Sequence, residues 1–242
     1  MERAEWLLHM RAQAEAFYDL FAPEYWVTFG LYPNETHLEY TRKFLARLAP
    51  RSTLLSAGCG AGRYDGFLLE AGHHVVGIDQ SAGMLARARE HFPQVRYERM
   101  GLQEMDVRAA FDGAICVDAM EHVCPEDWPG ILQRFGRALK PGGVLYLTVD
   151  PGDAGETAEA YARAKAMGLP VVFGEVADHV DEACVRAKAL GTSALPRELA
   201  DGAAYHYHPS PEQVRAWLAR AGLASEEQGT GNWYEHLLVR KT

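Results

Sequence analysis

The stretch Leu54-Leu55-Ser56-Ala57-Gly58-Cys59-Gly60-Ala61-Gly62-Arg63 decides the fold. Its apolar start predicts a short strand, and a helix is expected to open near Gly62. Glycines in the turn between them let a ligand approach the backbone closely, because no Cβ intrudes. The spacing is GxGxG, with Arg63 where the dinucleotide fingerprint GxGxxG requires its third glycine. The loop is therefore either a cradle for a ligand other than a dinucleotide or a simple tight turn.

A second feature is Asp79, which closes the run Val75-Val76-Gly77-Ile78-Asp79 and lies 21 residues after Gly58. An acidic residue about 20 residues beyond the first glycine is where α/β nucleotide sites hold ribose hydroxyls. One carboxylate can accept hydrogen bonds from both the 2′- and the 3′-hydroxyl, which favours a ribose without a 2′-phosphate. We expect Asp79 to bind a nucleoside; the alternative is an ordinary helix cap.

Short apolar runs alternate with helical stretches from residue 52 onward. Such alternation predicts parallel strands joined by right-handed helical crossovers. The runs are apolar on both faces, which fits strands covered on both sides. The expected strands are 53–57, 74–79, 95–100, 111–118 and 144–149. The expected helices between them are 62–71, 82–91 and 128–139.

The flanking parts of the chain have a different texture. The apolar spacing predicts helices over residues 1–50, and the Ala-, Gly- and acid-rich segment 150–204 reads as a helical insertion. Ser210 is a plausible N-cap of a helix over 211–221. The last two strands, 223–228 and 235–241, are expected to form a hairpin across 229–232. We divide the chain into a helical lid (1–50), a cofactor-binding core (51–149), a substrate cap (150–204) and the rest of the core (205–242).

Composition indicates an ordinary globular protein. The 242 residues are 48% apolar and 24% charged, with a net charge of −9, which excludes a disordered or fibrous chain. The acidic balance and the lack of a basic cluster argue against nucleic acid as a partner. The four cysteines form no CxxC pair, so reduced thiols are expected. No run approaches a membrane span, the N-terminus has no signal-peptide character, and we expect a cytoplasmic protein.

Four ordered motifs together resemble the class I (Rossmann-like) S-adenosylmethionine-dependent methyltransferases, most closely the branch that acts on small molecules. The resemblance covers residues 36–149. It implies an α/β, doubly wound, seven-stranded, mostly parallel sheet with the last strand antiparallel, and S-adenosyl-L-methionine as the cofactor. The helix with Phe17-Tyr18-Asp19 is similar to those that lie over the cofactor. The four motifs are Gly58-Cys59-Gly60-Ala61-Gly62, Gly77-Ile78-Asp79-Gln80-Ser81 with Met84-Leu85, Phe111-Asp112 through Met120-Glu121-His122-Val123, and Leu139-Lys140-Pro141-Gly142-Gly143.

The resemblance also implies roles for single residues. The glycine loop would line the methionine moiety and ribose, Asp79 would bind the ribose, and the residues after the third and fourth strands would border the adenine and the sulfonium. Two positions depart from the family pattern, Ser56 and Gly101, where acids are usual. The implied cofactor-binding set is Gly58, Cys59, Gly60, Gly62, Asp79, Gln80, Met84, Gly101, Leu102, Val117, Asp118 and Ala119.

The cofactor carries an activated methyl group, so orientation and exclusion of water are the main tasks left to the protein. His122 is the candidate base, or alternatively a structural side chain. The run Tyr205-His206-Tyr207-His208 could place two histidines on one face of a strand as metal ligands, but no third ligand is evident. No HExxH, HxE or paired-carboxylate pattern is present, so no metal is expected. The predicted lining of the substrate pocket is Tyr18, Tyr25, Trp26, His122, Tyr205 and His206.

The sequence thus predicts an enzyme that transfers a methyl group to a small-molecule acceptor. Three alternatives remain open: a cofactor-binding protein without transfer activity, a methyltransferase acting on a macromolecule, and a dinucleotide oxidoreductase, against which Arg63 argues. The N-terminal helices and the insertion are expected to meet over the carboxyl ends of the strands, where ligands of open α/β sheets bind. The alternative is an insertion that packs elsewhere. The acceptor and the oligomeric state do not follow from the sequence.

Overall fold

The computed structural model describes residues 1–30, 34–178 and 204–242. Helices and short 3-10 turns are α1 Arg3–Phe21, η1 Ala22–Glu24, α2 Tyr25–Phe29, α3 Glu35–Leu45, α4 Asp65–Glu70, α5 Ala82–His91, η2 Leu102–Glu104, η3 Met120–His122, α6 Trp128–Ala138, α7 Ala154–Ala166 and α10 Pro211–Arg220. Strands are β1 Thr53–Ala57, β2 His74–Asp79, β3 Arg96–Arg99, β4 Phe111–Cys116, β5 Leu139–Val149, β6 Glu175–Asp178, β7 Ala204–Tyr207, β8 Leu223–Gly231 and β9 Tyr234–Lys241.

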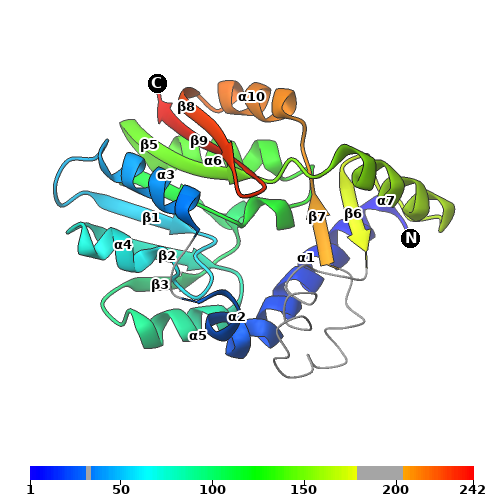
Figure 1. The fold of residues 1–242 in the computed structure, drawn as a ribbon, viewed down its shortest axis with the longest axis horizontal. Coiled ribbons are helices and arrows are strands. Elements are labelled where there is room, and N and C mark those ends of the chain that lie inside the picture. Colours follow the sequence, from blue (N-terminus) through cyan, green and yellow to red (C-terminus); the bar gives the residue numbers. More distant parts are fainter. Residues whose placement is uncertain (31–33, 179–203) are drawn as a thin grey trace.

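Seven strands form one sheet in the order β3-β2-β1-β4-β5-β9-β8 (Figure 1). The first five are mutually parallel, and β9 runs antiparallel to both β5 and β8. The order reverses at β1, so the carboxyl ends of β1 and β4 flank the switch point where open α/β sheets bind ligands. The predicted doubly wound, mostly parallel sheet is confirmed.

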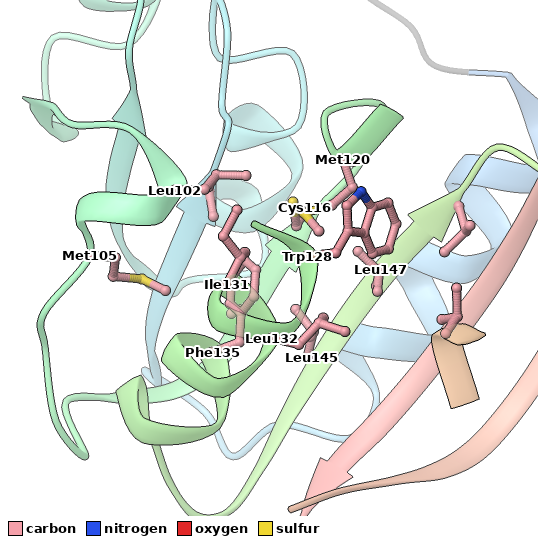
Figure 2. Packing of buried hydrophobic residues seen from close by; sticks show 14 of the residues in the cluster. Leu102, Met105, Cys116, Met120, Trp128, Ile131, Leu132, Phe135, Leu145 and Leu147 are labelled. Atoms are coloured by element: carbon pink, nitrogen blue, oxygen red, sulfur yellow. The ribbon is translucent and has the colours of Figure 1, made fainter. Parts of the chain in front are cut away.

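Helices cover both faces of the sheet. Successive residues of a strand point to opposite faces, so each strand contributes to two separate apolar clusters. Leu54 and Ile115 face α3, α4 and α5 in one apolar cluster. Leu55 and Cys116 face the other way, into a larger cluster under α6 and α10. Figure 2 shows the centre of that larger cluster, where residues of α6 lie against β4 and β5. The labelled side chains are Leu102, Met105, Cys116, Met120, Trp128, Ile131, Leu132, Phe135, Leu145 and Leu147.

The C-terminal hairpin turns later than the sequence suggests. The expected turn over 229–232 is wrong, because β8 continues to Gly231 and the turn lies at Asn232-Trp233. Both turn residues have positive φ, 50° and 74°. Two successive positive-φ residues are typical of a two-residue hairpin loop whose twist matches its strands. The longer hairpin carries Tyr234 to the carboxyl edge of the sheet.

The N-terminal helix α1 is clamped to the start of α5. The Asp19 carboxylate accepts hydrogen bonds from the Ser81 hydroxyl (2.6 Å) and the Gly83 amide (2.8 Å). A Cβ on Gly83 would lie 2.9 Å from the Asp19 carbonyl oxygen, so only glycine allows the helices to approach this closely. Because α5 begins at the carboxyl end of β2, this clamp holds α1 over the ligand-binding edge of the sheet (Figure 1).

The segment after β5 is part helix and part strand. Helix α7 agrees with the predicted helical insertion, but β6 and β7 pair antiparallel in a second, two-stranded sheet that the sequence did not suggest. The fully buried Glu175 of β6 joins this sheet to α1, because its carboxylate accepts from Arg3 (2.6 Å) and from the Tyr205 hydroxyl (2.7 Å). Positions 179–203 of the predicted insertion lie outside the described residues. No helix among the described ones is long and apolar enough to span a membrane.

Two glycines of α6 give a matched test of the packing. A Cβ on Gly136 would lie 2.3 Å from the Ala221 carbonyl oxygen, whereas one on Gly130 would meet nothing within 4 Å. We expect Gly136→Ala to cost about 1–3 kcal/mol through overpacking. Gly130→Ala should be neutral or stabilise by up to about 1 kcal/mol, because alanine favours the helix. Urea denaturation measures both; equal stabilities of the two variants would contradict this close approach of α6 to Ala221.

Candidate functional site

The carboxyl ends of the parallel strands open into one large cavity of about 1400 Å³. Residues that follow β1, β2, β3, β4 and β5 line it, and α1, α2 and α7 close its other sides. From β2 to β5 the edge crosses three strand spacings, about 14 Å at roughly 4.8 Å each. Small-molecule pockets usually measure about 300–1,000 Å³. The cavity therefore has room for two ligands side by side.

The glycine loop lies close to its neighbours across the cavity floor. Gly58 and Gly60 have φ of 61° and 52°, a region that glycine adopts without strain. A Cβ on Gly58 would lie 2.7 Å from the Ala119 Cβ, and one on Gly60 would lie 3.2 Å from the Met84 Cε. A larger residue at position 60 would therefore occupy the space between the loop and the start of α5.

Asp79 is half-buried at the end of β2 and joins two turns. One carboxylate oxygen accepts from the Gly60 amide (2.8 Å) and the other from the Ser81 amide (2.9 Å). Desolvation raises the pKa of this carboxyl, and the two backbone hydrogen bonds oppose the rise. Each oxygen keeps a second lone-pair position, so the carboxylate can still accept hydroxyl donors from a ligand in the cavity.

His122, in η3, contacts residues of α1 and β7. Its Nε2 lies 2.6 Å from the Tyr18 hydroxyl of α1, and its Nδ1 lies 3.3 Å from the Tyr205 carbonyl oxygen. A carbonyl only accepts, so Nδ1 carries the hydrogen in this arrangement and Nε2 accepts from Tyr18. In this tautomer Nε2 carries the lone pair that a general base requires.

Next to His122, the carboxylates of Asp118 and Glu121 lie along the β4 edge. Asp118 has φ of 51° and its side chain lies 2.8 Å from the Nε2 of buried His37. The Glu121 Oε1 accepts from the Tyr234 hydroxyl (2.9 Å), while its buried Oε2 has no hydrogen-bond partner among the described residues. Burial, with the nearby negative charge of Asp118, raises the pKa of Glu121 to about 8. This carboxyl is therefore largely protonated at neutral pH.

Three further side chains, of types that commonly bind metal ions, lie together at the β5 end of the cavity: Asp150, His206 and His208. Asp150 directly follows β5, and the two histidines belong to β7 and to the residue after it. The His206 ring also packs edge-on against His122, with centroids 4.9 Å apart. Burial lowers the pKa of His206 well below its ordinary value, so its imidazole is neutral. Asp150 thus supplies, beside the two histidines, the third side chain of a metal-binding type that was not evident from the sequence.

Most of the residues predicted for the site line this cavity. From the cofactor set these are Gly58, Cys59, Gly60, Asp79, Gln80, Met84, Gly101, Leu102, Val117, Asp118 and Ala119, and from the acceptor set Tyr18, Tyr25, His122 and His206.

Three predicted residues do not line the cavity. Gly62 packs behind the loop, where a Cβ would lie 2.9 Å from the Tyr97 hydroxyl. Trp26 turns away and stacks on His91, with ring centroids 4.5 Å apart. Tyr205 points into the core and donates to Glu175, because neighbouring positions of β7 face opposite sides and His206 takes the cavity side.

Sequence reasoning missed several polar residues of the site. Asp150, Glu121 and Tyr234 line the cavity, as does Asn34, whose side chain caps α3. One signal was available for the carboxylates: Glu121 and Asp150 lie just after strands β4 and β5, as Asp79 closes β2. Tyr234 carried no such signal, because its place depends on the exact length of the final hairpin.

Comparison with known proteins agrees with this geometry. Residues 54–143 match the family model described as a methyltransferase domain. The malonyl-[acyl-carrier protein] O-methyltransferase of Pectobacterium atrosepticum is 31% identical over 143 residues, which cover 55% of this chain and 54% of that protein. The chain spans little more than half the length of the curated relatives it matches.

Solved structures show the same fold over most of the chain. A SAM-dependent methyltransferase from Methanosarcina mazei superposes with a TM-score of 0.64 at 17% identity, covering 81% of this chain and 95% of that one. The magnesium protoporphyrin IX methyltransferase of Synechocystis, solved with bound S-adenosylhomocysteine, has a TM-score of 0.60 at 17% identity and covers 91% and 93%. The chain therefore has the fold of the class I, Rossmann-like methyltransferases, and its residues 54–143 match the methyltransferase-domain model.

Proposed function

We propose that this protein transfers a methyl group from S-adenosylmethionine to a small-molecule acceptor. The observation that carries the proposal is the Asp79 carboxylate, held by the Gly60 amide in a cavity with room for two ligands. The matched methyltransferase domain and the O-methyltransferase relatives support the same activity. A dinucleotide oxidoreductase is disfavoured, because Arg63 replaces the third glycine of the dinucleotide fingerprint.

The cofactor would lie along the edge from β2 to β4. Asp79 would accept the ribose hydroxyls, with the adenine between Met84 and the Gly101-Leu102 turn. Gly58 and Gly60 would leave room for the methionine moiety. The sulfonium would then face Asp118, whose negative charge suits a cationic ligand. Ser56, where the family usually has an acid, does not line the cavity, so this chain would bind the cofactor without that carboxylate.

The acceptor would occupy the remaining space near β5, under α1 and β7. We propose that residues 1–50 and the segment after β5 act as lid and cap, because both contribute lining residues and Glu175 ties them together. A cavity covered by these segments suits a small, partly apolar acceptor group. Named relatives act on malonyl-[acyl-carrier protein] and in ubiquinone biosynthesis, which supports an oxygen acceptor.

Transfer needs an in-line displacement. The acceptor lone pair forms the new bond to the methyl carbon, and the carbon–sulfur electron pair stays on sulfur. An acceptor hydroxyl must also lose its proton, and His122 is placed to take it on Nε2 when the acceptor replaces the Tyr18 hydroxyl there. A protein that binds the cofactor without transferring the methyl group is the second candidate. Release of S-adenosylhomocysteine in the presence of phenolic and carboxylic acceptors would distinguish the two.

Asp79→Ala tests the cofactor site. We expect S-adenosylhomocysteine to raise the melting temperature of the wild type by mass action, and NAD not to do so. The variant should lose at least about 100-fold in affinity, because two hydrogen bonds to a charged group, about 1.5–3 kcal/mol each, are removed. Asp106→Ala, at an exposed carboxylate, is the control. Unchanged affinity in Asp79→Ala, measured by calorimetry, would refute the assigned role.

Gly60→Val tests the close approach of the loop. A valine there is strained at φ of 52° and fills the space before Met84, so cofactor binding should be lost. Gly72→Val is the matched control, since Gly72 also has positive φ (82°) but nothing lies within 4 Å of its Cβ position. Circular dichroism should show both variants folded. Normal binding by Gly60→Val would mean that the loop is only a turn.

Glu121 gives a pH-dependent prediction. Its pKa is about 8 in the folded protein against an ordinary value of 4.5, so between these values the folded state holds a proton that the unfolded state has released. Stability should therefore fall as pH rises from about 5 to 8, by up to about 1.4 kcal/mol per pH unit from this group.

The variant Glu121→Gln has no proton to lose at this position, so its stability should fall less steeply over the same range. Urea denaturation at pH 5, 6.5 and 8 measures the difference, with Glu212→Gln, an exposed carboxyl of α10, as control. Parallel profiles for wild type and Glu121→Gln would show that the Glu121 carboxyl is ionised in the folded protein at neutral pH.

A further inference from the structure

Asp150, His206 and His208 come together from two parts of the chain. His206 of β7 and His208, directly after the strand, occupy alternate positions, and both line the cavity. Tyr205 precedes the two histidines and Tyr207 lies between them. These tyrosines are 3% and 2% exposed and point into the core. The buried tyrosines fix the register of the strand and thereby the direction of both imidazoles.

The spacing of the three side chains suits one ion. One ring nitrogen of each histidine and one oxygen of Asp150 lie within 4.8 Å of one another. Tetrahedral ligands about 2.0–2.2 Å from an ion are about 3.4 Å apart, so the widest pair has at most about 1.4 Å to close. The Nδ1 of His208 and the Oδ1 of Asp150 are already 3.5 Å apart. Small side-chain rotations therefore complete the set.

Neighbouring backbone groups hold the ligands in place. The Gly152 amide donates to Oδ1 of Asp150 (2.8 Å). Nδ1 of His208 lies 3.2 Å from the Asp150 carbonyl oxygen, and it would turn from this oxygen to the ion when it binds as a ligand. Gly152 has φ of 62°, and a Cβ there would lie 2.7 Å from the His208 ring. Glycine is thus required for His208 to approach Asp150. Supporting contacts of this kind orient the imidazoles and carboxylates of metal sites.

We propose that Asp150, His206 and His208 bind a divalent transition-metal ion such as Zn²⁺ at the acceptor end of the cavity. Two imidazoles and one carboxylate suit zinc and its neighbours, whereas Mg²⁺ and Ca²⁺ prefer oxygen ligands throughout. Three protein ligands leave positions open toward the cavity, as in catalytic rather than structural sites. The role of the ion rests on the proposed function: it would bind the oxygen of the acceptor and make the hydroxyl group of the acceptor more acidic.

Cobalt titration tests the site directly. The full-length protein, treated with a chelator and dialysed, is titrated with Co²⁺, whose visible absorption reports bound ligand geometry, and with Zn²⁺ in competition. We expect one site per chain. Loss of a supporting contact alone costs metal sites about 10–100-fold in affinity, so His206→Ala, His208→Ala and Asp150→Asn should each lose at least about 100-fold. His9→Ala, at an exposed histidine outside the cluster, should bind as the wild type does.

Two outcomes would overturn the proposal: a wild type that binds Co²⁺ no more tightly than the His206→Ala/His208→Ala double variant, or a His9→Ala variant that loses as much as the cluster variants. Thermal melting shows whether each variant is folded, and a cluster variant that is not folded is replaced by His208→Gln. Binding of S-adenosylhomocysteine is measured separately in the same samples. A wild type that does not bind S-adenosylhomocysteine would count against the proposed function and not against the metal site.

Discussion

The Asp79 carboxylate is the contact on which the arrangement of the cavity depends. It joins the glycine loop after β1 to the turn before α5, and Asp19 then fastens α1 to the same turn. Three segments from different parts of the chain therefore converge at the end of β2. Parallel strands place all their carboxyl ends on one edge of the sheet. The contacts at the end of β2 therefore also position the side of the cavity that faces the residues after β4 and β5.

A second set of polar contacts closes the far side. Glu175 is fully buried, yet it accepts from Arg3 and Tyr205 and also from the Val172 amide (2.6 Å). Burying an ionised carboxylate is costly unless it is paired and hydrogen-bonded, and here it is both. Removing Arg3 would leave the charge of Glu175 uncompensated, so this ion pair holds α1 against the β6–β7 sheet.

Much of the fold could be predicted, because its signals are local. Helix α5 begins and ends where expected, since Ser81 caps it and its apolar residues keep helical spacing. The signal for β6 is weak: the strand is four residues long, and Glu175 reads as a surface residue until its partners in α1 and β7 are known. The candidate site also depends on partners that are distant in the sequence. Asp150 lies 56 residues before His206, and only the fold brings them together.

The clamp between Asp19 and α5 has a consequence for how the cavity is covered. Helix α1 lines the cavity through Tyr18, and Asp19, the next residue, accepts from Ser81 and Gly83 at the start of α5. The turn that Asp79 holds is therefore also the turn that positions α1. A substitution in this turn would displace the covering helix as well as the floor beneath it.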